Sequence, residues 1–184
     1  SSDILTMTTH KNITVMPSNA NLAGAEVELT TVHGREFALK ELLNGILADY
    51  IIIDCPPSLG LLTINALCSA DKVLIPVQTE YYALEGITQL LQIVQKVQKS
   101  ANPKLSILGV LLTMYDQRTT LSKQVQDELS NHFGDLLFKT VIPRNIRLAE
   151  APSHGIPISE YDKWSKGARS YKALSKEVMN RTGV

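Results

Sequence analysis

An acidic side chain at the end of an apolar run is the first feature of this sequence that could do chemistry. Tyr50 to Ile53 is apolar and rich in β-branched residues, and Asp54 follows it directly. Such a run predicts a strand buried on both faces of a parallel sheet. Asp54 then lies at the carboxyl end of that strand, the edge where open α/β sheets bind ligands. A carboxylate there suits a Mg²⁺-nucleotide, held directly or through water. The alternative is that Asp54 only ends a strand.

The residues after Asp54 predict a turn and then a helix. Pro56 and Pro57 cannot continue a central strand, because proline has no N–H to donate. Ser58 can then cap a helix from about Leu59 to Ala70.

Three more loops follow predicted strands and are expected at the same edge: Gln78 to Tyr82, Thr113 to Asp116, and Pro143 to Asn145. Glu80 in the first loop, or Glu85 shortly after it, could act on a switch or across a dimer, although a plain helix start with Glu85 in its first turns is the simpler interpretation. The residues alone favour an ordinary turn at Pro143.

The elements that position these loops alternate between strands and helices. Apolar runs predict strands at 13–16, 50–53, 72–77, 105–113 and 137–142. Helical spacing predicts two helices, or one interrupted helix, over 22–32 and 36–48, and further helices over 59–70, 81–99, 119–133 and 165–181. This order predicts an α/β fold whose mostly parallel sheet has helices on both faces.

The composition is that of an ordinary globular domain. The chain has 184 residues, 44% hydrophobic and 20% charged, with a formal net charge of zero. We therefore expect a single domain over residues 1–184 and no global field that would attract nucleic acid. Cys55 and Cys68 lack metal-ligand spacing, which favours a reducing cytoplasm. No apolar run approaches the ~18 residues of a membrane span.

One longer string carries a specific resemblance. Residues 54–65 read Asp-Cys-Pro-Pro-Ser-Leu-Gly-Leu-Leu-Thr-Ile-Asn. This string closely resembles the Walker B and switch II stretch of the ParA/Soj partition ATPases, which belong to the MinD-like deviant-Walker-A group of P-loop proteins. The resemblance continues almost without a break to Val184.

The resemblance implies a function and roles for particular residues. ParA/Soj proteins segregate chromosomes or plasmids. They bind ATP with Mg²⁺, form a homodimer that binds DNA non-specifically on the nucleoid, and are stimulated by a ParB-type centromere-binding protein. By resemblance, Asp54 would hold the Mg²⁺ ion and its water. The carbonyl of Pro143 and the amide of Asn145 would contact the adenine.

The sequence departs from that family at the phosphate site. P-loop proteins need a glycine-rich loop with a lysine on the β and γ phosphates, and this sequence has no Gly-Lys dipeptide. We expect it to begin roughly a third of the way into a ParA-like protein and to show negligible ATPase activity by itself. Two interpretations stay open, a piece of a partition ATPase and a naturally short, non-catalytic module that binds DNA or a partner. An unrelated Rossmann-like enzyme is a weaker third, because no G-x-G-x-x-G is present.

Basic residues collect near the carboxyl terminus. Lys163, Lys166 and Arg169 are the candidate DNA contacts, to which Lys139 and Arg144 add charge. Phosphate contacts need positive charge within reach and no exact motif. The alternative is a solvated helix face of mixed charge. The last helix has few bulky apolar residues, so we expect no membrane anchor.

Overall fold

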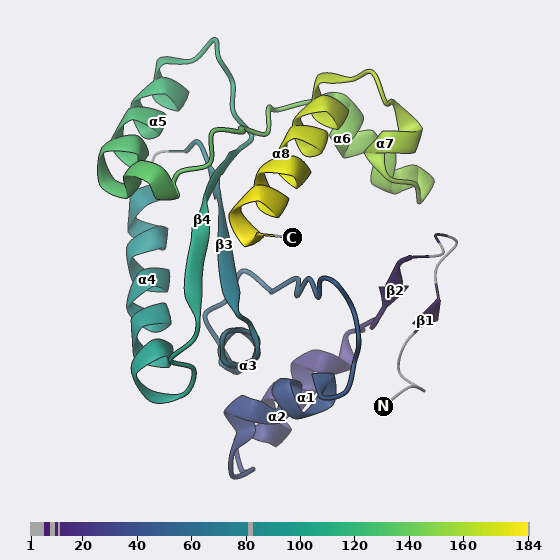
Figure 1. Cartoon of the computed structure of the whole chain (residues 1–184), viewed down its shortest axis with the longest axis vertical. Coiled ribbons are helices and arrows are strands. Elements are labelled where there is room, and N and C mark those ends of the chain that lie inside the picture. Colours follow the sequence, from purple (N-terminus) through teal and green to yellow (C-terminus); the bar gives the residue numbers. More distant parts are fainter. Residues whose placement is uncertain (1–5, 8–9, 11, 81–82, 184) are drawn as a thin grey trace. The chain divides into compact units, whose positions relative to one another are not determined.

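The computed structural model describes residues 6–7, 10, 12–80 and 83–183. The chain divides into two compact units, one made of Ser1–Asp71 with Val94–Leu105 and the other of Lys72–Ile93 with Ser106–Val184. Each unit is described by itself (Figure 1). The expectation of a single domain over 1–184 stays a prediction.

The second unit is built on a parallel strand pair. Strand β3, Lys72–Gln78, runs beside β4, Ser106–Thr113, with Lys72 opposite Ser106 and Gln78 opposite Thr113. The register shifts between Val73 and Leu74, which leaves one extra residue in β4 as a bulge. The predicted strand at 137–142 also lies alongside β4, but as two isolated parallel bridges, Val110 to Leu137 and Tyr115 to Pro143.

Helices cover both faces of this sheet. Helix α4, Ala83–Ser100, and helix α5, Thr120–Phe133, lie on one side of the strands, and helix α8, Lys166–Thr182, lies on the other (Figure 1). Side chains of β4 alternate between the two faces. Val110 and Leu112 join the core that contains Ile87, Val125 and Leu129, while Leu111 joins Phe138, Ile142 and Leu174. The predicted α/β class with a parallel sheet and covering helices is confirmed.

Helix α8 is fastened to the bulge by one arginine. The bulge occupies Leu108, and the Arg181 guanidinium donates to the carbonyls of Leu108 at 3.1 Å, Leu136 at 3.3 Å and Leu137 at 2.9 Å. It also pairs with Glu177 at 3.0 Å, and its central carbon lies 4.0 Å from the centre of the Phe138 ring. Arg181 therefore joins α8 to backbone carbonyls of β4 and of the segment beside it.

Two helices of this unit, α5 and α8, are capped by the side chain of the residue before their first turn. The Thr119 hydroxyl accepts from the Ser122 N–H at 3.2 Å, and the Ser165 hydroxyl accepts from the Ala168 N–H at 3.0 Å. The chain between residue 142 and α8 contains two short helices, α6, Ile146–Glu150, and α7, Ile158–Tyr161, with a 3₁₀ turn at Ala151–His154 between them.

The first unit is mostly helical. Strands β1, Thr6–Met7, and β2, Thr14–Val15, pair antiparallel. They are followed by helix α1, Asn21–Leu29, a 3₁₀ turn at Arg35–Phe37, helix α2, Ala38–Leu43, and helix α3, Leu61–Ser69.

Two buried asparagines hold the first unit together. The Asn65 side chain accepts from the Leu39 N–H at 3.1 Å and donates to the Arg35 carbonyl at 2.9 Å, which ties α3 to the start of α2. The Asn102 amide donates to the carbonyls of Leu67 and Ala70 near the end of α3. Because these amides are buried, their bonds fix the packing of the helices as well as satisfying polar atoms.

The prediction of a buried strand at Tyr50–Ile53 was wrong. No strand includes these residues, and Ile52 is 90% exposed while Ile51 is 47% exposed. Among the described residues, no neighbouring strand pairs with the run, so its backbone groups have no ladder to join. A β-branched run becomes a strand only where a partner and a packing surface are present.

The prediction of a Ser58 cap was also wrong. Helix α3 begins after Gly60, and the Glu26 carboxylate of α1 accepts from the Leu61 N–H at 2.6 Å. A Cβ atom at residue 60 would collide with that carboxylate. Glycine therefore leaves room for a capping group from a distant helix, at the end where helix dipoles favour negative charge.

Among the described residues, no helix is both long enough and apolar enough to cross a membrane.

Candidate functional site

Three loops meet at the carboxyl edge of the sheet in the second unit. The Tyr115 N–H donates to the Ile142 carbonyl at 3.1 Å, and the Arg144 N–H donates to the Tyr115 carbonyl at 3.0 Å. The Thr79 N–H donates to the Thr113 carbonyl at 3.3 Å. The structure therefore brings together the loops after β3, after β4 and after residue 142, as expected for parallel strands.

A buried cluster of hydroxyl groups supports this edge. The Thr79 and Ser122 hydroxyls lie 3.0 Å apart, and the Thr119 hydroxyl donates to Ser122 at 2.8 Å. Thr79 and Ser122 are both buried. The Thr79 hydroxyl also donates to the carbonyl of Met114 at 3.3 Å. Met114 has a φ of 52°, a left-handed conformation that is uncommon for a residue with a side chain. The loop after β4 is thus held in a defined shape, and sequence patterns gave no signal of this cluster.

Asn145 presents an acceptor without a donor. It is the residue before α6, and its Oδ1 atom is buried with no hydrogen-bond partner among the described residues. Buried polar atoms are nearly always paired, so an orphan acceptor is suited to a donor from a ligand. Pro143, two residues earlier, is half-buried at the same edge.

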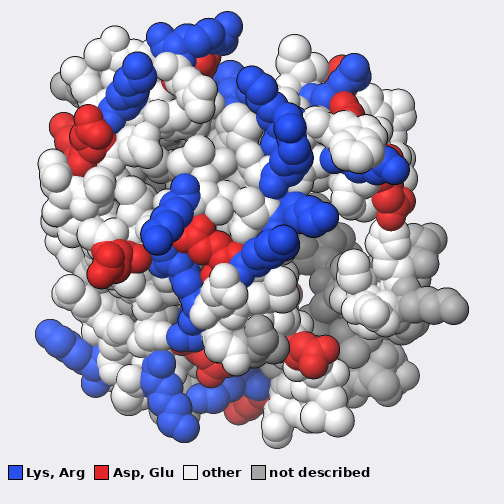
Figure 2. Space-filling model, turned by 45° about the horizontal axis from the view of Figure 1, so that its top comes forward, with Lys and Arg blue, Asp and Glu red and all other residues white. Residues whose placement is uncertain are grey.

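A basic hollow of about 580 Å³ opens beside these loops. We use this name for the concavity lined by Tyr115, Asp116, Gln117, Arg118, Val141, Pro143, Arg144, Lys166, Arg169 and Ser170. Four of these side chains are cations and one is a carboxylate. Figure 2 shows Lys and Arg side chains standing out from the surface with carboxylates scattered between them. The hollow therefore carries a local positive charge although the whole chain is neutral.

The single carboxylate of the basic hollow is already neutralised. Asp116 accepts from Arg118 at 2.7 Å and 3.0 Å. These side-chain bonds, joined by the Arg118 backbone N–H, lower the pKa of Asp116 to about 2. No carboxylate in the described part of the chain forms an ion pair with Arg144, Lys166 or Arg169. Such unpaired cations can receive phosphate oxygens.

Two of the three predicted DNA contacts line the basic hollow and the third does not. Lys166 and Arg169 line the basic hollow, whereas Lys163 lies in the preceding turn with its ammonium 5.3 Å from the centre of the Trp164 ring. Arg144 lines the hollow as the added charge, while Lys139 does not. Arg118 was not among the residues expected from the sequence. Its position two residues after the loop residue Asp116 could have indicated that it lies at the same edge.

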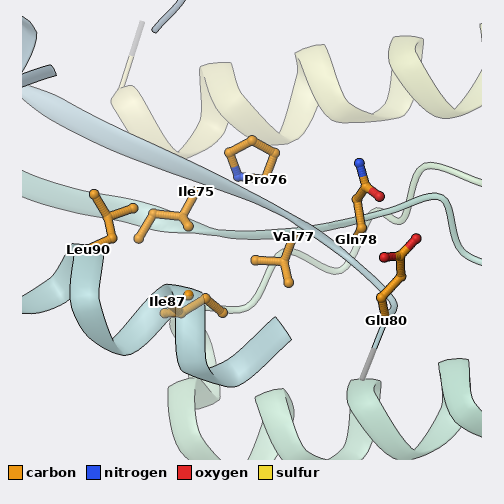
Figure 3. Close-up of a pocket in the computed structure, with 8 residues that line it drawn as sticks. Ile75, Pro76, Val77, Gln78, Glu80, Ile87 and Leu90 are labelled. Carbon is orange, nitrogen blue, oxygen red and sulfur yellow. The ribbon is translucent and has the colours of Figure 1, made fainter. Parts of the chain in front are cut away.

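A second, apolar groove of about 370 Å³ lies between β3 and the first turns of α4. It is lined by Ile75, Pro76, Val77, Gln78, Glu80, Gly86, Ile87 and Leu90. Figure 3 shows Gln78 and Glu80 at its carboxyl end and the apolar side chains along the rest. Polar groups do not converge in it, so the groove suits packing more than chemistry.

Asp54 belongs to the first unit and is exposed on the extended segment before α3. Burial, followed by the Asp54 charge, raises the pKa of the neighbouring Cys55 thiol. Within the described residues, no group of three or more His, Cys, Asp or Glu side chains forms a metal cage. The shared site of Asp54 with Pro143 and Asn145 stays a prediction, as do the roles of Glu80 and Glu85.

The chain is similar to named bacterial proteins along nearly its whole length. A family model described as an AAA domain matches residues 1–107. The chain is 58% identical to the sporulation initiation inhibitor protein Soj of Bacillus subtilis (strain 168), covering 96% of the chain and 70% of that protein. It is 50% identical to the chromosome partitioning protein ParA of Myxococcus xanthus (strain DK1622), covering 97% of the chain and 64% of that protein.

The same likeness extends to solved structures. A crystal structure of cobyrinic acid a,c-diamide synthase from Mycobacterium smegmatis with bound ADP and magnesium matches with a TM-score of 0.79 at 36% identity. That match covers 99% of this chain and 67% of the other.

Proposed function

The chain belongs to the Soj/ParA family of chromosome-partitioning ATPases, and we propose that it supplies the base-contacting and DNA-binding part of an ATP-dependent partition protein. The observation that carries this proposal is the basic hollow at the carboxyl edge, where unpaired cations lie beside the loop of Pro143 and Asn145.

The residues present fit an adenine nucleotide with Mg²⁺. The buried Oδ1 of Asn145 would accept from the exocyclic amine of adenine, and the Pro143 carbonyl would accept beside it. Mg²⁺ typically uses one or two carboxylates and completes its shell with water and phosphate oxygens, so the single exposed Asp54 suits it. When bound, the ion neutralises charge on the phosphates. Asp54 would hold it and orient its water.

The phosphates themselves find no cradle in this sequence, which contains no Gly-Lys dipeptide. We therefore propose negligible ATP hydrolysis by these 184 residues alone. Turnover that scales with purified chain and vanishes in Asp54→Ala would show this proposal to be wrong.

DNA contact is the second part of the proposal. Arg118, Arg144, Lys166 and Arg169 would contact backbone phosphates, which requires charge and reach but no base recognition. Asn145 does not line the basic hollow, so base contact to a nucleotide and phosphate contact to DNA are separable. We further propose a homodimer on the cytoplasmic nucleoid that is stimulated by a ParB-type centromere-binding partner.

The competing candidate is a non-catalytic module that binds DNA or a partner without nucleotide. Titration calorimetry with Mg-ATP separates the two. Binding that is lost in Asn145→Ala supports the nucleotide proposal. Absence of binding at millimolar ATP in the wild-type chain favours the non-catalytic module.

DNA binding is tested by fluorescence anisotropy of a labelled duplex over a range of salt. The double variant Lys166→Ala/Arg169→Ala is expected to bind more weakly and to lower the salt slope by about 0.9 for each lost phosphate contact. Lys172→Ala/Lys176→Ala is the matched control, because it removes equal charge from the same helix but lies outside the basic hollow. Equal loss in both variants would contradict a local site.

A further inference from the structure

The turn before α8 presents a large aromatic side chain to solvent. Trp164 is 77% exposed and is the one tryptophan of the sequence. Large aromatic side chains supply much of the contact energy at binding surfaces, and tryptophan is seldom left so exposed without use. The exposed surface of Trp164 is therefore a candidate contact for a ligand.

The backbone that carries Trp164 is fixed by its neighbours. The Trp164 N–H donates to the Asp162 carboxylate at 3.1 Å, and the Ser165 N–H donates to the Asp162 carbonyl at 3.1 Å. The Ser165 hydroxyl donates to that same carbonyl at 2.8 Å and caps α8 at Ala168. A ring on so constrained a turn loses little conformational freedom when it binds.

Positively charged residues flank Trp164 in the sequence. The Lys163 ammonium lies 5.3 Å from the ring centre, and Lys166 and Arg169 follow within the next five residues and line the basic hollow. The carboxylate of the turn, Asp162, is offset by Arg147 at 3.6 Å. The exposed ring and the cations of Lys166 and Arg169 therefore belong to one turn and the start of one helix, a combination that fits a ligand with both aromatic faces and phosphates.

We propose that Trp164 stacks on an unpaired nucleobase of DNA whose phosphates lie on the basic hollow. Stacking platforms beside a basic groove bind single strands without sequence preference, since every base has a π-face. The inference rests on the proposed DNA binding and adds to it a preference for unpaired bases over a duplex of equal length. Trp164 contributes contact and no charge.

The ring reports its own contact, because no other tryptophan fluoresces in the chain. The whole 184-residue chain is titrated with short oligothymidylate and with a duplex of equal length, following both Trp164 fluorescence and the anisotropy of a dye on the DNA. We expect quenching by the single strand. We expect Trp164→Ala to lose about tenfold in affinity for it, with an unchanged salt slope.

Three variants separate stacking from charge and from folding. Lys166→Ala is expected to lower the salt slope of single-strand binding by about 0.7. Trp164→Phe should restore part of the affinity, since a smaller ring still stacks. Tyr171→Ala is the control, because Tyr171 is an exposed aromatic residue of α8 outside the basic hollow. Circular dichroism confirms that each variant is folded.

The outcomes distinguish the two proposals. If labelled DNA binds but Trp164 is not quenched and Trp164→Ala binds as tightly as wild type, the stacking inference fails and the DNA proposal stands. If no DNA binds at low salt, both fail. A blue shift with vesicles of phosphatidylcholine and phosphatidylserine in equal parts, without quenching by DNA, would assign the ring to a membrane surface and overturn the inference.

Discussion

Replacing Arg181 by methionine tests how helix α8 is held on the sheet. The guanidinium serves the carbonyls of Leu108, Leu136 and Leu137, and the β-bulge leaves the first of these outside the regular ladder. Methionine keeps an unbranched stem of similar length but provides no donor. Arg181→Met therefore leaves these carbonyls and the Glu177 carboxylate without their cationic partner.

The size of the effect follows from the bonds and their exposure. A hydrogen bond to a charged group contributes about 1.5–3 kcal/mol when it is part-buried. The Arg181 and Glu177 side chains are 20% and 17% exposed, so water replaces some of the lost bonds. We take about 3 kcal/mol in total, which lowers the melting temperature of a domain this size by about 6–12 °C.

The assay is urea unfolding followed by circular dichroism, with Arg169→Met as the matched control. Arg169 lies on the same helix, is exposed, and forms no ion pair with a described residue, so its loss should change the unfolding free energy by less than about 0.5 kcal/mol. Equal midpoints for the two variants would refute the reasoning.

The pH dependence of stability tests the same contact through Glu177, the carboxylate that pairs with Arg181. Burial raises the pKa of Glu177, but the backbone N–H groups of Lys139 and Thr140, together with Arg181, outweigh it and lower that pKa overall. Because the folded pKa is depressed, the stabilisation is complete above the unfolded value of about 4.3 and is lost as pH falls through the folded value. The destabilisation by Glu177→Gln should therefore shrink below about pH 4, and a cost independent of pH would contradict this.

Three further outcomes are expected. Gly109→Ala should destabilise the chain by at least about 2 kcal/mol in urea unfolding, since Gly109 has a φ of 154° and a Cβ would collide with Arg181 and the Leu136 carbonyl; a wild-type midpoint would argue against it. Glu26→Gln should weaken the start of α3 by about 1 kcal/mol, seen as faster hydrogen exchange of that first helical turn. The Asp116 carboxyl should titrate near pH 2 by NMR. Because its pKa is depressed, its pairing is complete above about pH 4 and lost through about 2, and Arg118→Gln should move the midpoint upward.

Sequence patterns predicted the elements whose periodicity and end signals agree. Strands β3 and β4 and helices α4, α5 and α8 lie within a few residues of their expected bounds. The side chains of Thr119 and Ser165 cap α5 and α8 at the positions where the expected helices begin. These predictions agree with the structure because the apolar residues of the strands and the apolar faces of the helices are buried in the same cores.

The failures share one physical cause. Tyr50 to Ile53 has the composition of a buried strand but lies exposed, and Ser58 has the chemistry of a cap but does not cap. Whether a run pairs, or which carboxylate reaches a helix start, depends on groups distant in sequence. Glu26 caps α3 across 35 positions, and no local pattern contains that information.

The sequence by itself determined the α/β class, the family through residues 54–65, and a neutral chain with cations near its carboxyl end. Tertiary structure decided which of those cations share one hollow, that Arg118 joins them, and that the Trp164 side chain is exposed to solvent. It also decided that Asn145 keeps a buried acceptor without a donor. Local composition fixes which elements form, whereas long-range contacts fix which side chains meet and which are left for a ligand.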